Sequence, residues 1–172
     1  MRRIRIYTDQ PLSAESQVEL HDDSAHYVSK VLRLRIADPL FVFNGNGHEY
    51  DGYVEDMSKK SVLLTLEKQL SPQTESRLHT ILGLGISRGE RMDFAIQKST
   101  ELGVSIIVPL FTEHCEVKLA AERLDRRQEH WQQIAVSACE QSGRVKIPVV
   151  AKPLVLSEWL KTVEAERKFM FD

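Results

Sequence analysis

The sequence has 172 residues, 42% of them hydrophobic and 28% charged, a balance typical of a globular protein and not of a disordered chain. Its 23 Lys and Arg residues are balanced by 25 Asp and Glu residues, and the formal net charge of -2 excludes a polycation. Nucleic-acid binding would therefore need a local basic patch. No apolar run approaches the roughly 20 residues of a membrane span or forms a signal core. Two cysteines without a CxxC pair predict a reducing, cytoplasmic compartment.

The first 70 residues predict mainly short strands. Branched and aromatic residues gather in four runs, at residues 4–6, 40–43, 50–54 and 61–67. The stretch 44–47, Asn-Gly-Asn-Gly, tolerates positive φ and predicts a hairpin. The apolar spacing within 25–32 predicts one helix, capped by Asp23 or Ser24. Several short strands and one helix predict a small barrel, because closing a sheet removes its exposed edges.

The second half alternates strand and helix patterns. Residues 71–77 are polar, include a proline and lack periodicity, so they predict a linker. After it, the predicted strands are 79–86, 104–110 and 149–150, and the predicted helices are 91–102, 124–141 and 156–164. Gly103 is placed to end the first of these helices. This order predicts a parallel sheet with helices on its faces.

The last residues form one more apolar run. Residues 168–171, Lys-Phe-Met-Phe, predict a central strand. In open α/β sheets the ligand binds beyond the carboxyl ends of the strands. Because the sequence stops at such an end, we expect part of the site to be missing.

Two segments beside the first helix of the second half are candidates for chemistry. Residues 83–85, Gly-Leu-Gly, with Gly89 give a spacing one residue too long for GxGxxG, so a turn is favoured over a nicotinamide dehydrogenase. Arg88 can bind phosphate bidentately, or its side chain can simply be solvated at the start of the helix. Lys98 and Glu101 form either a surface ion pair or part of a cleft.

The longest predicted helix ends in Glu-Gln-Ser-Gly-Arg. Gly143 suits a helix C-cap, and Arg144 complements the negative helix end. Helix capping does not explain why Glu140 and Gln141 are present, and these two unexplained polar residues indicate a functional site.

The cysteines predict no catalytic or metal site. Cys139 lies on the apolar stripe of the long helix and predicts a small core residue. Cysteine catalysis paired with His114 is disfavoured, because adjacent residues on a strand point to opposite faces. A zinc site needs four ligands, which Glu113, His114 and Cys115 do not supply, so no metal is predicted.

Basic side chains predict an RNA contact if they gather on one face, while scattered charge is the slightly favoured alternative. The candidate RNA-binding residues are Arg2, Arg5, His26, Lys30, Arg33 and Arg88.

Six segments carry a family resemblance: HYVSKVLR at 26–33, FNG at 43–45, SRGERM at 87–92, QKSTELG at 97–103, PLFTE at 109–113 and EQSGR at 140–144. Together they resemble motifs of the RsmE-type 16S rRNA uridine-N3 methyltransferases. The match runs through the whole chain in order, and QKSTELG with EQSGR is a specific pair.

The resemblance implies a two-domain α+β protein. A PUA-like RNA-binding barrel is expected at 1–70, and a SPOUT-class α/β methyltransferase domain with a C-terminal trefoil knot from 78 to 172, with 71–77 between them. The implied cofactor is S-adenosylmethionine (SAM), and the implied partners are 16S rRNA in the small ribosomal subunit and a second copy of the chain. No membrane or metal is implied.

The resemblance stops short of the knot. The family's Gly-Pro-Glu-Gly-Gly-like and Leu-Gly-x-x-Ile/Val-Leu-Arg-like loops do not occur in this sequence. The main cofactor-binding loops are therefore expected beyond Asp172. A fragment of a longer protein is favoured over a truncated, inactive version.

Methylation at uracil N3 requires removal of a proton and stabilisation of the resulting charge, on a base that is flipped or unpaired. The candidate catalytic residues are Glu101, Glu140, Gln141 and Arg144. We expect them to cluster at helix ends on the cofactor side, where a carboxylate accepts the proton and an arginine stabilises the anion. The alternative function is a non-catalytic RNA-binding module.

Overall fold

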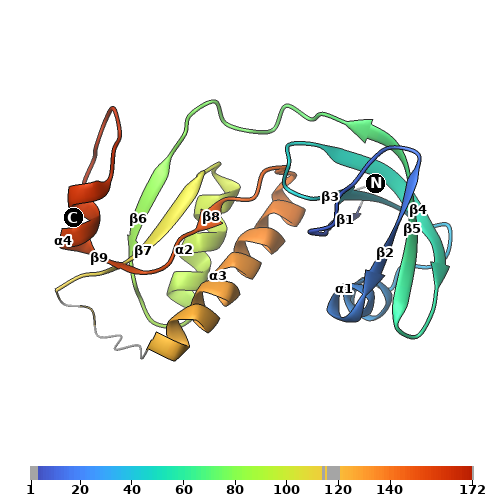
Figure 1. The fold of residues 1–172 in the computed structure, drawn as a ribbon, viewed down its shortest axis with the longest axis horizontal. Helices are drawn as coiled ribbons and strands as arrows, with labels where there is room; N and C mark the ends of the chain where they lie inside the picture. Colours follow the sequence, from blue (N-terminus) through green and yellow to red (C-terminus); the bar gives the residue numbers. More distant parts are fainter. Residues whose placement is uncertain (1–3, 114, 116–120, 172) are drawn as a thin grey trace.

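The computed structural model describes residues 4–113, 115 and 121–171. The predicted RNA contact Arg2 and the cysteine partner His114 lie outside these residues. The chain forms two sheets, joined by a stretch at 71–80 that contains neither helix nor strand (Figure 1). No helix within the described ranges combines the length and apolar character needed to cross a bilayer.

The N-terminal sheet has five strands in the order β1-β3-β4-β5-β2, with β1 parallel to β3 and the other pairs antiparallel. The strands are β1 (Ile4–Tyr7), β2 (Ser16–His21), β3 (Pro39–Phe43), β4 (Glu49–Met57) and β5 (Ser61–Leu70). All four strands expected in this half are confirmed. Strand β2 was not predicted, because its inward residues Val18 and Leu20 make a pattern too short to recognise.

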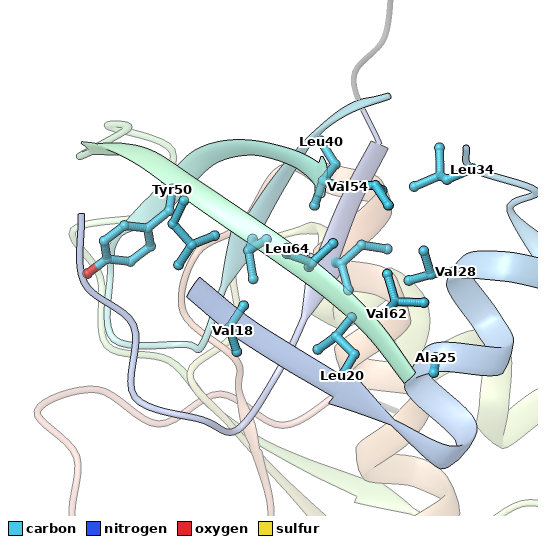
Figure 2. Packing of buried hydrophobic residues seen from close by; sticks show 13 residues of the cluster. Val18, Leu20, Ala25, Val28, Leu34, Leu40, Tyr50, Val54, Val62 and Leu64 are labelled. Carbon is cyan, nitrogen blue, oxygen red and sulfur yellow. The ribbon is translucent and has the colours of Figure 1, made fainter. Parts of the chain in front are cut away.

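One core fills the concave side of this sheet. Alternate residues of β5, namely Val62, Leu64 and Leu66, are almost completely buried, as the two-residue period of a strand requires. Ile6 of β1 and Leu20 of β2, from opposite ends of the strand order, belong to the same cluster. The sheet therefore curls around one core, although the strand order leaves β1 and β2 as its two edges (Figure 2).

The predicted hairpin joins β3 to β4. Gly45 and Gly47 adopt φ values of 83° and 99°, which L side chains rarely adopt. The predicted helix of this half is also present, as α1 (Asp22–His26) continued by the π-helical turn η1 (Tyr27–Val31). Its predicted cap is wrong: the N-cap residue is His21, without a side-chain hydrogen bond to the helix. Strand β2 runs directly into the helix and leaves no separate capping position.

The second sheet is parallel throughout, as predicted. Its strands are β6 (Ile81–Gly85), β7 (Ile106–Phe111), β8 (Val149–Val150) and β9 (Leu154–Val155), and the helices are α2 (Glu90–Glu101), α3 (Ala121–Ser142) and α4 (Leu156–Thr162). Strand β7 pairs with all three other strands. The two-residue strand β9 was not predicted, because its pairing to Leu110 and Phe111 is a tertiary contact that two residues cannot encode.

Helices cover both faces of this sheet. Met92 and Ile96 of α2, Trp131 and Ala135 of α3, and Ile107 of β7 form one buried cluster. On the other face, a Cβ added to Gly83 would meet the ring of Trp159 in α4 at 2.5 Å, so α4 packs directly on the strand. Trp131 of α3 is fully buried in this core.

Because its strands are parallel, they all begin on one side of the sheet and all end on the opposite side. We call the edge with Ile81, Ile106 and Val149 the amino edge, and the edge with Gly85 and Phe111 the carboxyl edge. Helices α2 and α3 run back from the carboxyl edge, so they end at the amino edge. In Figure 1 the N-terminal sheet lies beside the C-terminal end of α3, at the amino edge.

The predicted strand at 168–171 is wrong. Residues beyond α4 form neither helix nor strand as far as 171, and the side chains of Phe169, Met170 and Phe171 are 77–89% exposed. An apolar run becomes a strand only where another strand accepts its hydrogen bonds, and no described strand pairs with this one.

Candidate functional site

Arg144 follows α3 and lies buried at the amino edge. Gly143, with a φ of 86°, ends α3 as predicted and turns the chain so that Arg144 points back into the fold. Its Nη1 donates hydrogen bonds to the backbone oxygens of Thr100 (3.0 Å) and Val104 (2.9 Å). Arg144 therefore joins the last turn of α2, through the Thr100 carbonyl, to the segment that leads into β7, through the Val104 carbonyl.

Glu75 completes this network. Its Oε2 accepts hydrogen bonds from Nη2 (2.8 Å) and Nε (3.2 Å) of Arg144, while Oε1 accepts from the backbone nitrogens of Val145 and Lys146. Burial works to raise the pKa of the Glu75 carboxyl, but these hydrogen bonds outweigh it and lower that pKa. Sequence reasoning missed Glu75, because nothing distinguishes one acidic residue in a polar linker.

Glu140 and Arg5 join the two sheets. Glu140 Oε1 accepts a hydrogen bond from the backbone nitrogen of Tyr7 (2.9 Å), and burial raises the pKa of its carboxyl although this bond and Arg5 oppose the shift. The Arg5 guanidinium donates to Glu49 and to the backbone oxygens of Cys139 (2.6 Å) and Arg144 (3.0 Å). With its side chain only 9% exposed, Arg5 holds β1 against α3 instead of presenting charge on an open surface.

Glu101 and Gln141 are the more accessible candidates. Both oxygens of Glu101 accept hydrogen bonds from Lys98 Nζ, at 2.9 and 2.8 Å, which is the surface ion pair considered above. The side chain of Gln141 is exposed. The four candidates therefore gather at one edge of the sheet, but each carboxylate has its own partner.

The structure places all four residues at the amino edge, and their expected position on the cofactor side stays a prediction. Each is at the C-terminal end of a helix or directly after it, and such ends lie at the amino edge. Ligands of open α/β sheets bind at the opposite edge, beyond the carboxyl ends of the strands.

The carboxyl edge is formed by the segments after β6 and β7. Ile86 extends the pairing of these strands, since its backbone nitrogen donates to Leu110 O (2.9 Å). Beyond it, Arg88 is exposed, and Gly89 has a φ of 53° and is the N-cap residue of α2. Residues 83–85 lie within β6, so they form neither a dinucleotide-binding loop nor the turn that the sequence favoured.

The remaining basic candidates lie on the N-terminal half. His26, Lys30 and Arg33, on or just after the α1–η1 segment, are exposed. They remain a predicted RNA contact, whereas Arg5 is used within the fold.

The cysteines do not form a reactive centre in the described structure. Cys139 is fully buried, as predicted, and burial raises the pKa of its thiol to about 12. Within the described residues, no group of three or more His, Cys, Asp and Glu side chains is placed to hold a metal ion.

Two protein families match this chain. The RNA methyltransferase PUA domain matches residues 20–67, which span β2 to β5, and the RNA methyltransferase domain matches residues 74–172. The second match begins one residue before Glu75.

Named relatives agree with these matches. Ribosomal RNA small subunit methyltransferase E of Buchnera aphidicola (strain APS) is 36% identical over 97% of this chain, which spans 66% of that relative. The enzyme of the same name from Rickettsia conorii is 34% identical over 94% of the chain.

Solved structures extend the likeness to three dimensions. A Legionella pneumophila protein solved with bound SAM superposes with a TM-score of 0.94 at 36% identity, covering 98% of this chain and 69% of that one. Ribosomal RNA small subunit methyltransferase E from Neisseria gonorrhoeae, solved with S-adenosyl methionine, gives 0.90 at 35% identity, covering 96% and 68%.

Proposed function

This chain belongs to the RNA methyltransferase family, and from that premise we propose that the protein methylates N3 of a uridine in 16S rRNA of the small ribosomal subunit, with SAM as methyl donor. The observation that carries the proposal is the likeness to the SAM-bound Neisseria enzyme over 96% of the chain. The PUA-type N-terminal half supports RNA as the substrate class.

Bound SAM supplies a methyl group on a positively charged sulfur. At the carboxyl edge the described residues offer Ser87, Arg88 and Thr112 as polar partners. We propose that these side chains contact SAM and that loops beyond Asp172 enclose it.

The chain's own residues have two kinds of proposed role. Transfer to N3 breaks the N3–H bond, so a carboxylate or water must accept the proton while donors stabilise the uracil oxygens. Arg144 and Glu140 are bonded within the fold, which supports positioning roles for them. Glu101 and Gln141 are more accessible and remain the candidates for contact with the base.

Further parts of the proposal come from the family resemblance. We propose a barrel at 1–70, a methyltransferase domain from 78 with a C-terminal knot, a cytoplasmic location and action as a homodimer. The two described sheets, on either side of 71–80, are compatible with this division. Sedimentation of the complete protein tests the dimer, since a monomer at all concentrations would contradict it.

Methyl transfer tests the central proposal. Small ribosomal subunits lacking the modification are incubated with SAM and the complete protein, and nucleosides from 16S rRNA are resolved by mass spectrometry. The expected product is N3-methyluridine at one position, which its chromatographic retention time distinguishes from uridine methylated at C5. Methylation elsewhere contradicts the N3 assignment, and RNA binding without any transfer supports the binding-module alternative.

A further inference from the structure

A polar hollow lies at the amino edge of the second sheet. Its cavity volume is about 320 Å³, near the lower end of the range for ligand pockets. It is lined by residues 75–79, by Arg144 and residues 146–148, and by Gly103 and Ser105, which precede β7. The hollow therefore lies where the chain enters the second sheet.

The lining of this hollow is positively charged although the chain as a whole is not. Arg77, His79 and Lys146 line it with exposed side chains, for which the described residues provide no hydrogen bond or ion pair. Its one acidic residue, Glu75, is bonded to Arg144. With His79 neutral, the lining has a formal charge of +2, in a chain whose net charge is -2.

The hollow also adjoins the N-terminal half. The backbone nitrogen of Gly47 in the β3–β4 hairpin donates to Val145 O at 3.2 Å, and a Cβ added to Gly47 would lie 3.4 Å from the Lys146 side chain. A strand of RNA that crosses this position would touch both halves of the molecule. Phosphate oxygens are the groups that a cluster of Arg, Lys and His donors binds best.

We propose that this hollow binds a backbone phosphate of the RNA substrate. The inference rests on the proposed function for its substrate class. Because the amino edge lies about 17 Å from the carboxyl edge, the length of a five-residue strand, this contact is separate from the edge at which ligands of open α/β sheets bind. It contributes affinity without reading sequence.

Salt-dependent RNA binding by the whole chain tests the proposal. Anisotropy of a labelled single-stranded RNA is measured over a series of KCl concentrations for the wild type and for Arg77→Ala/Lys146→Ala. The site binds one phosphate, and each lost phosphate contact lowers the salt slope by about 0.7 for single-stranded RNA, so the double variant is expected to lose about 0.7. At 0.1 M salt this equals a loss of affinity of about 5-fold.

Two matched variants distinguish the effect of charge in the hollow from the effect of the net charge of the protein on RNA binding. Lys59→Ala/Lys60→Ala removes the same charge from the exposed β4–β5 turn and is expected to keep the wild-type slope. Arg77→Lys/Lys146→Arg keeps the charges and is expected to retain most of the affinity. Unchanged thermal midpoints are expected for all variants, since these side chains are exposed.

Each result has a defined meaning. If the double variant binds RNA like the Lys59/Lys60 control, the proposed hollow is not a phosphate site, while the methyltransferase proposal is unaffected. If inorganic phosphate at matched ionic strength weakens RNA binding by the wild type but not by the double variant, the hollow is the phosphate contact, and equal weakening of both overturns the proposal. If the wild type binds no RNA, both proposals are contradicted.

Discussion

The two edges of the parallel sheet differ in how their polar groups are used. At the amino edge, Arg144, Glu75 and Arg5 are bonded to the ends of α2 and α3, to each other or to the N-terminal half. At the carboxyl edge, Arg88 and Thr112 are exposed on segments that follow the strands. The buried polar groups of the amino edge thus join the elements of the fold, while the carboxyl edge is the one at which ligands of open α/β sheets bind.

Arg144→Ala is expected to have the largest effect. It removes a buried cation, leaves Glu75 partly buried without its ion partner, and takes one hydrogen-bond donor each from the carbonyls of Thr100 and Val104. We expect the free energy of unfolding to fall by about 4 kcal/mol, measured by urea denaturation. The carboxyl-edge control Arg88→Ala is expected to change it by less than about 1 kcal/mol. Equal losses at the two edges would contradict the comparison.

Glu75→Gln tests the same network through its charge. We expect a loss of about 2 kcal/mol at pH 7, since a neutral amide replaces a carboxylate that accepts charge-assisted hydrogen bonds. The lowered pKa of Glu75 means that its contribution is present above its ordinary value of 4.5 and is lost as the pH falls through the folded-state value. The wild type and the variant should therefore converge below pH 4.5.

A difference that persists unchanged into acid would show that the Glu75 effect is not ionic. The exposed carboxyl-edge residue Glu113 offers the control, and Glu113→Gln should change the unfolding free energy by less than about 0.5 kcal/mol at pH 7.

Gly83→Ala tests the helix that covers the other face of the sheet. The added Cβ would meet the Trp159 ring at 2.5 Å and Leu110 Cδ1 at 2.8 Å, so α4 must shift. We expect a loss of about 1.5 kcal/mol and a change in Trp fluorescence. At Gly85 the nearest atom is 3.7 Å away, so Gly85→Ala should have little effect. Equal effects at both positions would mean that α4 does not lie on β6.

Glu140→Gln is expected to have the smallest effect, with the opposite dependence on pH. The pKa of the Glu140 carboxyl is raised by burial, so its contribution to stability is present below pH 4.5 and is lost as the pH rises through the folded-state value. The stability of the variant should not fall in this way as the pH rises. The amide oxygen of the new side chain should still accept the hydrogen bond from the Tyr7 backbone nitrogen. The expected gain at pH 7 is less than about 1 kcal/mol, and a loss above 1 kcal/mol would contradict it.

Local sequence patterns predicted most of the fold. The strand at 61–67 and the helix at 124–141 appear with small extensions, because alternation and helical periodicity are local properties. The strand at 168–171 fails because a strand also needs a partner, which a single segment cannot specify. The short strand β9 escaped notice for the same reason.

The candidate site was predictable in its members and not in their surroundings. EQSGR stood out in sequence, yet the bonds of Arg144 to Glu75, which lies 69 positions earlier, exist only in the folded chain. The edge on which these residues lie follows from topology, since a helix between two parallel strands runs opposite to them. Arg5 was misjudged because charge alone does not show that a guanidinium is enclosed by Cys139 O and Glu49.

The place of Glu75 has a practical consequence for exchanging halves between related proteins. The stretch 71–77 reads as a spacer, but Thr74 bonds to Gly143 O and Glu75 to Arg144, so its second part belongs to the α/β fold. A chimera joined at residue 78 would combine Arg144 from one parent with a foreign residue at position 75 and leave a buried cation unmatched. The crossover point that keeps each half intact lies before Thr74.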